Sequence, residues 1–261
     1  MKAHERHNRA RWDRESDRYQ AGHGAWIGQA PDAWGAWRIP EAEVRLLPNV
    51  AGTDILELGC GGGQWCGWLA RQSAHVTGID LSGRQLDHAQ RNFAAAEVAV
   101  RLVQGSAEQL PFAAGVFDLV LSDHGAMSWG DPERTVPEVA RVLRPGGILI
   151  VCCTSPLFSM CWEGAGSDDR GRRSRVEQRG ERLRGSYFDL SATPEGDGAM
   201  SFTIPYCEWV RLFGAHDLAI EALLEPRPSA GTISHFYPDA TEWVQRWPAE
   251  TIWKVRRKPL G

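Results

Sequence analysis

A glycine-rich segment is the feature of this sequence that most directly suggests chemistry. Residues 57–63 read ELGCGGG and follow a short apolar run. Glycine lets the backbone turn tightly and lets a ligand approach it closely. The helix expected after the glycines offers free N–H groups and a positive dipole end to an anion. Asp80 ends the next apolar run, where a carboxylate can accept hydrogen bonds from two ribose hydroxyls. These residues predict a site for a nucleoside with an anionic group nearby.

The glycine segment differs from two familiar nucleotide motifs. A dinucleotide site favours G-x-G-x-x-G or G-x-G-x-x-A, but the sixth position counted from Gly59 is Gln64. The pattern is E-x-G-x-G-x-G instead, and the sequence contains no G-K-S or G-K-T of a P-loop. A nicotinamide-dependent oxidoreductase built on a doubly wound sheet therefore stays open as an alternative, although Gln64 opposes it.

Residues 54–154 alternate short apolar segments with amphipathic ones. The expected strands are 54–59, 75–80, 100–105, 117–123 and 148–154. The expected helices are 63–72, 82–97 with Ser82 as N-cap, and 132–143. Strands that are apolar throughout and alternate with helices indicate a parallel sheet covered on both faces. The fold class is therefore α/β, with a doubly wound sheet that brings the residues discussed above to its carboxyl edge.

Composition excludes several other classes of protein. The net charge is −4 from 29 basic and 33 acidic residues, so we expect no nucleic-acid partner, which usually leaves a basic footprint. No apolar run reaches the ~18 residues of a membrane helix, and the charged N-terminus lacks a secretory signal. We therefore expect a cytoplasmic protein without membrane contact. The six cysteines form no C-x-x-C pair, so we expect neither a metal site nor disulfides.

Five motifs within 54–154 resemble the core of the class I S-adenosylmethionine-dependent methyltransferases, especially the small-molecule branch. They are LELGCGGG at 56–63, GIDLS at 78–82, GSAEQLPF at 105–112, FDLVLSD at 117–123 and LRPGGILIV at 143–151. The resemblance implies a Rossmann-like, seven-stranded, mostly parallel sheet that ends in an antiparallel hairpin. It also implies S-adenosyl-L-methionine as cofactor.

The resemblance further implies roles for individual residues. Glu57 would orient the methionine amino group, and Asp80 would hold the ribose. Ser106 stands where the family often has Asp, near the adenine amino group. The full set of implied cofactor-binding residues is Tyr19, Glu57, Gly59, Cys60, Gly61, Gly63, Asp80, Leu81, Ser106, Ala107, Glu108, Ser122 and Asp123.

His124 is the best-placed titratable residue for catalysis. It follows the expected strand 117–123, and acceptors of methyltransferases sit over the carboxyl ends of the central strands. Imidazole can act as a general base near neutral pH. The alternative is that His124 packs or contacts the cofactor without a proton role. His235 is a second candidate.

The predicted activity is methyl transfer to an oxygen, nitrogen or carboxylate of a small-molecule acceptor, with secondary metabolism as one setting. Two alternatives remain: the oxidoreductase, and a protein of this fold that binds the cofactor without transferring methyl. The chain is expected to be a monomer or a homodimer.

The flanking regions complete the predicted organisation. Residues 1–50 form an N-terminal helical lid, and residues 51–261 form the methyltransferase domain. The lid contains helices at 9–19 and 41–47, and its tryptophans at 26, 34 and 37 either close over an apolar ligand or anchor the segment permanently. The domain carries an acceptor-side insertion at about 155–201. The elements expected after it are a strand within 201–209, a helix at 209–214 and a strand at 218–226. A helix and an edge strand are expected within 243–258. The charged stretch 163–185 is expected to be mobile, with a phosphate-binding patch as the alternative.

Overall fold

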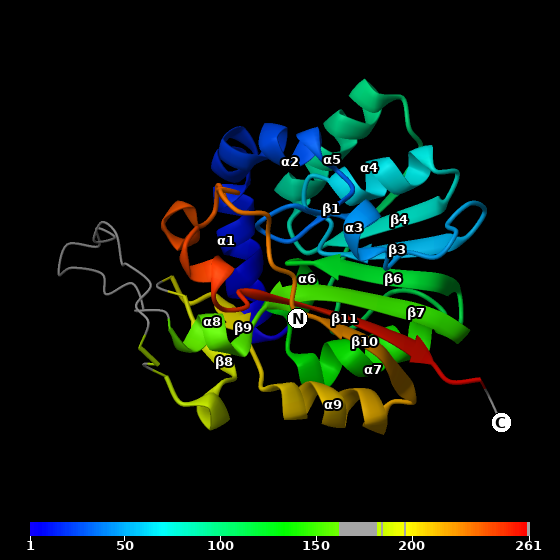
Figure 1. Ribbon diagram of the computed structural model, residues 1–261. Coiled ribbons are helices and arrows are strands. Elements are labelled where there is room, and N and C mark those ends of the chain that lie inside the picture. Colours follow the sequence, from blue (N-terminus) through cyan, green and yellow to red (C-terminus); the bar gives the residue numbers. More distant parts are fainter. Residues whose placement is uncertain (162–181, 184, 196, 260–261) are drawn as a thin grey trace.

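The computed structural model describes residues 1–161, 182–183, 185–195 and 197–259. Its centre is a seven-stranded sheet with the order β10-β11-β7-β6-β3-β4-β5 (Figure 1). The parallel strands are β3 (Asp54–Leu58), β4 (His75–Asp80), β5 (Arg101–Gln104), β6 (Phe117–Asp123) and β7 (Leu143–Thr154). The antiparallel hairpin is β10 (Leu218–Leu224) with β11 (Glu250–Arg257). The predicted fold class is confirmed.

Helices cover both faces of this sheet, as its apolar strands require. The helices between and after the parallel strands are α4 (Gln64–Arg71), α5 (Gly83–Ala96), α6 (Ala126–Trp129), α7 (Pro132–Val142) and α9 (Tyr206–Ala215). One buried cluster joins Leu56 and Leu58 to α7 and α9, and the other joins Ile55 to α4 and α5. Alternate residues of β3 thus face opposite layers. Ser82 caps α5 by accepting a hydrogen bond from the Gln85 N–H at 3.2 Å, as predicted.

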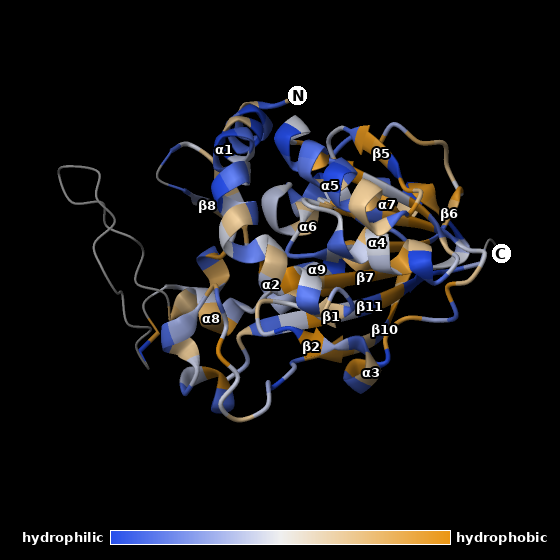
Figure 2. Cartoon of the chain, turned by 90° about the horizontal axis from the view of Figure 1, so that it is seen from above, coloured by the Kyte–Doolittle hydropathy of each residue, from blue (hydrophilic) through white to orange (hydrophobic). Residues whose placement is uncertain are grey.

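The N-terminal segment lies along the carboxyl edge of the sheet. Its elements are α1 (Ala3–Tyr19), the π-helical turn η1 (Gln20–Gly24), α2 (Ala25–Gln29), β1 (Ala33–Trp34), β2 (Ile39–Pro40) and α3 (Glu41–Val44). Helix α1 is largely hydrophilic (Figure 2) and packs on α5 through polar contacts. Asp17 pairs with Arg84 at 2.7 Å and with His88 at 2.8 Å. A charged helix therefore attaches to the domain without a broad apolar face.

The structure corrects three details of the expected organisation. Strand β11 lies between β10 and β7 and is not an edge strand, because its side chains are buried against both neighbours; β10 is the edge. The predicted strand within 201–209 is β9 (Met200–Phe202), which pairs with β8 (Ala192–Pro194) outside the main sheet. The helix expected at 41–47 ends at Val44, because Arg45 adopts a left-handed conformation with φ 49°.

The insertion after β7 begins with α8 (Pro156–Met160) and includes the short helix η2 (Tyr187–Asp189). The stretch 163–185 that we expected to be mobile lies outside the described residues, apart from 182, 183 and 185. Two more short helices, η3 (Pro238–Ala240) and η4 (Trp243–Gln245), precede β11. Among the helices of the described ranges, none has the length and apolar character required to cross a membrane.

Candidate functional site

The glycine loop connects β3 to α4 and is shaped by contacts within the protein. A Cβ on Gly59 would lie 2.2 Å from the Ala126 nitrogen, and a Cβ on Gly63 would lie 2.4 Å from the Phe93 ring. Both glycines are therefore needed for internal packing. At Gly61, with φ +52°, the nearest atom to such a Cβ is 3.8 Å away. Of these three glycines, Gly61 leaves open space for a ligand beside the backbone.

Two carboxylates flank this loop, of which Glu57 is buried and Asp80 is partly buried. Asp80, at the end of β4, accepts hydrogen bonds from the Gly61 N–H at 2.9 Å and from the Ser82 N–H at 2.8 Å. Burial raises the pKa of Asp80 to about 6, although these N–H groups act to lower it. Glu57, only 5% exposed, accepts a hydrogen bond from the Cys66 N–H at 2.9 Å. Burial raises the pKa of Glu57 to about 8, although the hydrogen bonds with Cys66 act to lower it.

These carboxylates suit the polar groups of a nucleoside with a cationic substituent. Within the described residues, neither Asp80 nor Glu57 forms an ion pair, and each has unused acceptor capacity. Hydroxyl groups near Asp80 and an ammonium near Glu57 would donate the hydrogen bonds, and the ammonium the positive charge, that these carboxylates lose when water is excluded. The donor set therefore fits the cofactor that the sequence predicts.

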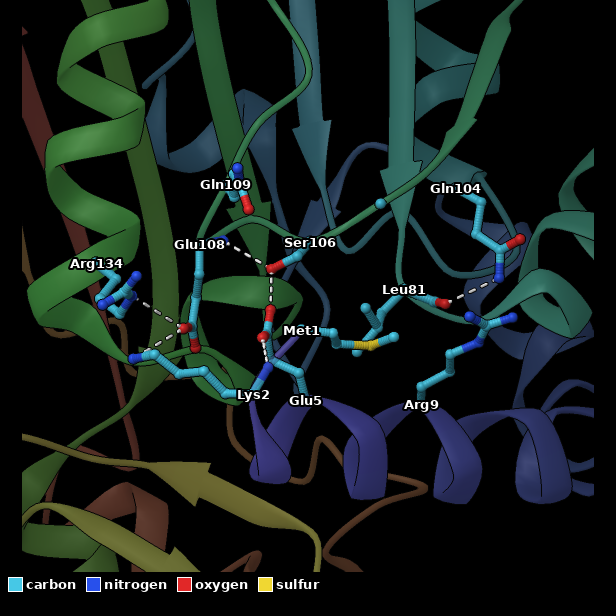
Figure 3. Close-up of a pocket in the computed structure, with 11 residues that line it drawn as sticks. Met1, Lys2, Glu5, Arg9, Leu81, Gln104, Ser106, Glu108, Gln109 and Arg134 are labelled. Atoms are coloured by element: carbon cyan, nitrogen blue, oxygen red, sulfur yellow. Dashed lines mark hydrogen bonds and ion pairs between the residues drawn. The ribbon is translucent and has the colours of Figure 1, made fainter.

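A pocket of about 370 Å³ opens beyond Asp80, within the size range of small-ligand sites. Leu81, Ser106 and Glu108 line it from the loops that follow β4 and β5. Glu5 and Arg9 of α1 line it from the opposite side (Figure 3). The structure thus brings together three of the predicted adenine-side residues. Ala107 does not line this pocket and is buried in the apolar core.

Cys60 and Ser122 serve contacts inside the protein. Cys60 is 3% exposed, and its sulfur lies against Gly78, where an added Cβ would approach it to 2.9 Å. The Ser122 hydroxyl, fully buried, donates to the Leu58 carbonyl at 3.1 Å. Ser122 therefore ties the end of β6 to the end of β3.

His124 lies directly beside the glycine loop. The following residue, Gly125, is so close that its added Cβ would be 2.2 Å from the Leu58 carbonyl oxygen. His124 has a left-handed conformation with φ 49°, and its N–H donates to the Cys152 carbonyl at 2.9 Å. A bulky residue adopts this backbone conformation only where its surroundings require it. The loop therefore holds the imidazole at the carboxyl edge of β6.

Glu250, the first residue of β11, is the partner of this imidazole. Its Oε1 lies 2.5 Å from His124 Nε2 and also accepts the Ala36 N–H at 2.6 Å. Burial acts to lower the pKa of His124, but the charge and hydrogen bond of Glu250, together with Asp123, outweigh it and raise that pKa above its ordinary value. His124 is therefore hydrogen-bonded through Nε2 to the buried carboxylate of Glu250.

Asp123 joins the same region to the N-terminal segment. It accepts hydrogen bonds from the Gly35 N–H at 3.0 Å and from Trp65 Nε1 at 3.1 Å, and it pairs with Arg38 at 3.8 Å. Burial, and after it the charge of Asp123, raise the pKa of Tyr19. Tyr19 therefore lies within electrostatic reach of this carboxylate, and its role at the cofactor stays a prediction.

Asp123, His124 and Cys152 also present donor atoms within 4.8 Å of one another. Their chemistry does not favour a cation. Burial raises the pKa of the Cys152 thiol well above its ordinary value, and Asp123 already binds three groups of the protein. We therefore assign no metal to this cluster.

The sequence interpretation missed Arg38 and Glu250. Neither belongs to a recognisable motif, and each contacts the site from a segment distant in sequence. The available signal was a charge among buried aromatic and apolar neighbours, in WRIP at 37–40 and WPAETIW at 247–253. His235, the second candidate base, is exposed and stacks on Trp26 with ring centroids 4.2 Å apart.

Comparison with known proteins agrees with this geometry. The family model described as a methyltransferase domain matches residues 56–151, and a solved S-adenosylmethionine-dependent methyltransferase from Mesorhizobium loti is similar over 83% of this chain and 96% of its own, with 25% identity and a TM-score of 0.63. Residues 56–151 therefore form a methyltransferase domain, within a chain that has the fold of solved S-adenosylmethionine-dependent methyltransferases. A solved structure from Listeria monocytogenes shares the fold, with 21% identity, a TM-score of 0.63, and coverage of 84% of this chain and 97% of that one.

Curated relatives of this methyltransferase domain have different acceptors in their names. A demethylmenaquinone methyltransferase from Clavibacter sepedonicus is 35% identical over 116 residues, which are 44% of this chain and 46% of that protein. A fatty-acid O-methyltransferase from Mycolicibacterium smegmatis is 36% identical over 123 residues, which are 46% of this chain and 44% of that protein. The chain thus spans about half the length of the curated relatives it matches.

Proposed function

We propose that this protein transfers a methyl group from S-adenosylmethionine to a small-molecule acceptor that must lose a proton, with His124 as general base. The observation that carries the proposal is the His124–Glu250 pair, set beside the glycine loop at the carboxyl edge of β6. A base is useful only if the nucleophile starts protonated. The proposal therefore favours a hydroxyl, amine or acidic carbon over an ionised carboxylate.

The cofactor side of this proposal uses the carboxylates of Asp80 and Glu57. Asp80 accepts hydrogen bonds from the ribose hydroxyls, and Glu57 binds the methionine amino group near the open backbone of Gly61. Arg38 Nε is buried and has no hydrogen-bond partner among the described residues, so it is available to an acceptor oxygen or to the methionine carboxylate. The cofactor, when bound, supplies a methyl group already activated on a sulfonium, so alignment and exclusion of water supply much of the catalysis.

The proton path follows from the Glu250 contact. Glu250 accepts the hydrogen on His124 Nε2, and this fixes the neutral tautomer in which Nδ1 carries the lone pair. Nδ1 then takes the proton of the acceptor, and the resulting imidazolium is stabilised by Glu250. Glu250 also bonds the Ala36 N–H, which restrains its carboxylate in the position that this role needs.

The two relatives provide a test of the acceptor class. Formation of S-adenosylhomocysteine would be measured with a set of phenols and hydroquinones and, separately, with fatty acids. The proposal expects turnover with the first set and a rate that rises with pH as His124 loses its proton. Turnover of fatty acids alone, with no dependence on His124, would contradict the assigned base. Cofactor binding without transfer to any acceptor would favour the alternative of a non-catalytic binding protein.

A further inference from the structure

The pocket beyond Asp80 is the place for the base of the nucleoside. Asp80 ends β4, and the pocket begins at the next residue, Leu81, and continues to Gly105 and Ser106 after the neighbouring strand β5. A ribose held at Asp80 therefore directs its base into this pocket. The far wall belongs to α1 (Figure 3), which lies about 100 residues away in sequence from the loop at Ser106. A residue that recognises the nucleobase from that wall must therefore belong to the N-terminal helix α1.

Glu5 is the acidic group on that wall. It is only 6% exposed, yet it lines the pocket. Its Oε1 accepts the Ser106 hydroxyl proton and its Oε2 accepts the Lys2 N–H. Burial acts to raise the pKa of Glu5, but these hydrogen bonds, together with the charges of the N-terminal ammonium and His4, outweigh it and keep the pKa below its ordinary value. The described ion pairs include none with Glu5, and each carboxylate oxygen retains a free lone pair.

Glu108, the other acidic residue of the pocket, is already compensated. It binds His4 Nε2 at 2.5 Å and accepts the Asp131 N–H at 2.9 Å. It also pairs with Lys2 and Arg134 at 3.5 Å each. Glu108 thus fixes the start of α1 against the domain, and its Oε2, without a hydrogen bond among the described residues, has two cations beside it. Glu5 lines the same pocket with no ion pair among the described residues.

The Ser106 hydroxyl is already used in hydrogen bonds to Glu5 and Glu108. It donates to Glu5 and accepts the Glu108 N–H at 3.0 Å. A hydroxyl has one proton, so Ser106 cannot donate to Glu5 and to a ligand at the same time. Its visible role is to orient the Glu5 carboxylate, which makes Glu5 the acceptor available to a donor on the base.

We propose that Glu5 selects adenine, its carboxylate accepting a hydrogen bond from the exocyclic amino group of the base. This inference rests on the proposed function. A carboxylate only accepts hydrogen bonds, so it favours a base that presents an amino group and opposes one that presents a carbonyl oxygen at the same position. Ser106 is the positioning residue for Glu5.

The test compares two ligands that differ at that position. S-adenosyl-L-homocysteine carries the amino group, and S-inosyl-L-homocysteine carries a carbonyl oxygen in its place. Calorimetric titration of the wild-type protein is expected to show about 10- to 100-fold tighter binding of the adenosyl compound, the scale of one hydrogen bond to a charged group. A wild-type ratio near 1 would overturn the inference, and this measurement needs no variant.

Glu5→Gln supplies the second arm, because an amide can donate to the inosyl carbonyl. The variant is expected to weaken adenosyl binding, improve inosyl binding and reduce their ratio at least about 10-fold. The matched control is Glu15→Gln, the same change on the same helix, which should preserve both affinities. If Glu5→Gln weakens both ligands equally, Glu5 only supports the helix and the inference fails. If the wild-type protein binds neither ligand, the proposed function fails as well, a result distinct from binding without selectivity.

Discussion

The cofactor side and the acceptor side of the site are assembled differently. The proposed cofactor side consists of the glycine loop, Asp80 and the loop at 105–108, each of which ends or directly follows a parallel strand. The proposed acceptor side consists of Arg38, His124 and Glu250, which are far apart in sequence and meet through the contacts of Asp123 and of Glu250 with the N-terminal segment. The first arrangement follows from a local chain pattern, and the second exists only when the whole domain is folded. Variants of the two sides should therefore produce separable defects.

The largest expected effect belongs to the acceptor side. His124→Ala should lower kcat by about 100-fold or more, the usual contribution of a positioned base. Its affinity for S-adenosylhomocysteine should stay within about twofold of the wild type, because the carboxylates of the cofactor side are untouched. Steady-state kinetics and calorimetry would separate the two quantities. Wild-type kcat in this variant would leave His124 a packing role only.

Glu250→Gln tests whether the distant segment supports the base. Glu250 raises the pKa of His124, so its neutralisation should lower that pKa. Since the active base is the neutral imidazole, the rising limb of the pH–rate profile should move to lower pH while the plateau falls. The measurement is kcat/KM against pH. An unchanged limb would show that Glu250 stabilises the fold without tuning His124.

Asp80→Ala should impair the cofactor side by itself. Loss of hydrogen bonds to a charged group costs about 1.5–3 kcal/mol, so affinity for S-adenosylhomocysteine should fall roughly 10- to 150-fold. In wild-type protein, affinity should also decline as the pH drops below about 6, the pKa of Asp80 in the free protein, because protonation removes the carboxylate. Calorimetry across this pH range would measure both. Tighter binding of NAD than of S-adenosylhomocysteine would contradict the cofactor assignment.

Glu57 should produce a smaller signal, a proton released on binding. Its pKa of about 8 leaves it mostly protonated at pH 7 in the free protein. A bound ammonium favours the carboxylate and lowers this pKa, so about 0.5–1 proton should leave for each cofactor bound at pH 7. Titration in buffers with different ionisation enthalpies would detect it, and Glu57→Gln should abolish it. Equal apparent enthalpies in all buffers would place the amino group elsewhere.

The smallest effect concerns the N-terminal segment. Trp34 is fully buried and Trp37 is 2% exposed, whereas Trp26 is only half-buried. Amide hydrogens at 33–37 should therefore exchange slowly with or without ligand, while those at 20–29 should exchange fast and become slower with S-adenosylhomocysteine. Hydrogen exchange followed by mass spectrometry would resolve the two parts. Full protection of 20–29 without ligand would remove the lid hypothesis.

The same contrast explains what the sequence could predict. Strands 75–80 and 117–123 have the predicted limits, because short apolar runs between polar residues have few other ways to be buried. Asp80 and His124 were identifiable because each ends or follows such a run. The position of β11 in the sheet was not predictable, because its neighbouring strands are determined by packing between distant segments. An apolar strand has the same sequence pattern at the edge of a sheet and in the middle.

The glycines show a subtler limit. Their spacing correctly predicted a tight loop, but the sequence could not tell that Gly59 and Gly63 serve contacts with Ala126 and Phe93. Ser106 is similar: the resemblance placed it near the adenine amino group, and only the proximity of α1 shows that its hydroxyl is directed to Glu5. A local sequence pattern predicts the position of a residue in the fold, whereas its hydrogen-bond partner depends on segments that are distant in sequence.

The placement of β11 gives this protein a built-in order of assembly. During synthesis, the N-terminal segment and then β3 to β7 leave the ribosome before β10 and β11, since the chain emerges from its N-terminus onward. Strand β10 follows, but its neighbour in the sheet is β11, which is made later. Glu250 arrives with that late strand. The residues that line the pocket beyond Asp80 are therefore synthesised well before Glu250, so His124 gains its carboxylate partner only when the last strand joins the sheet.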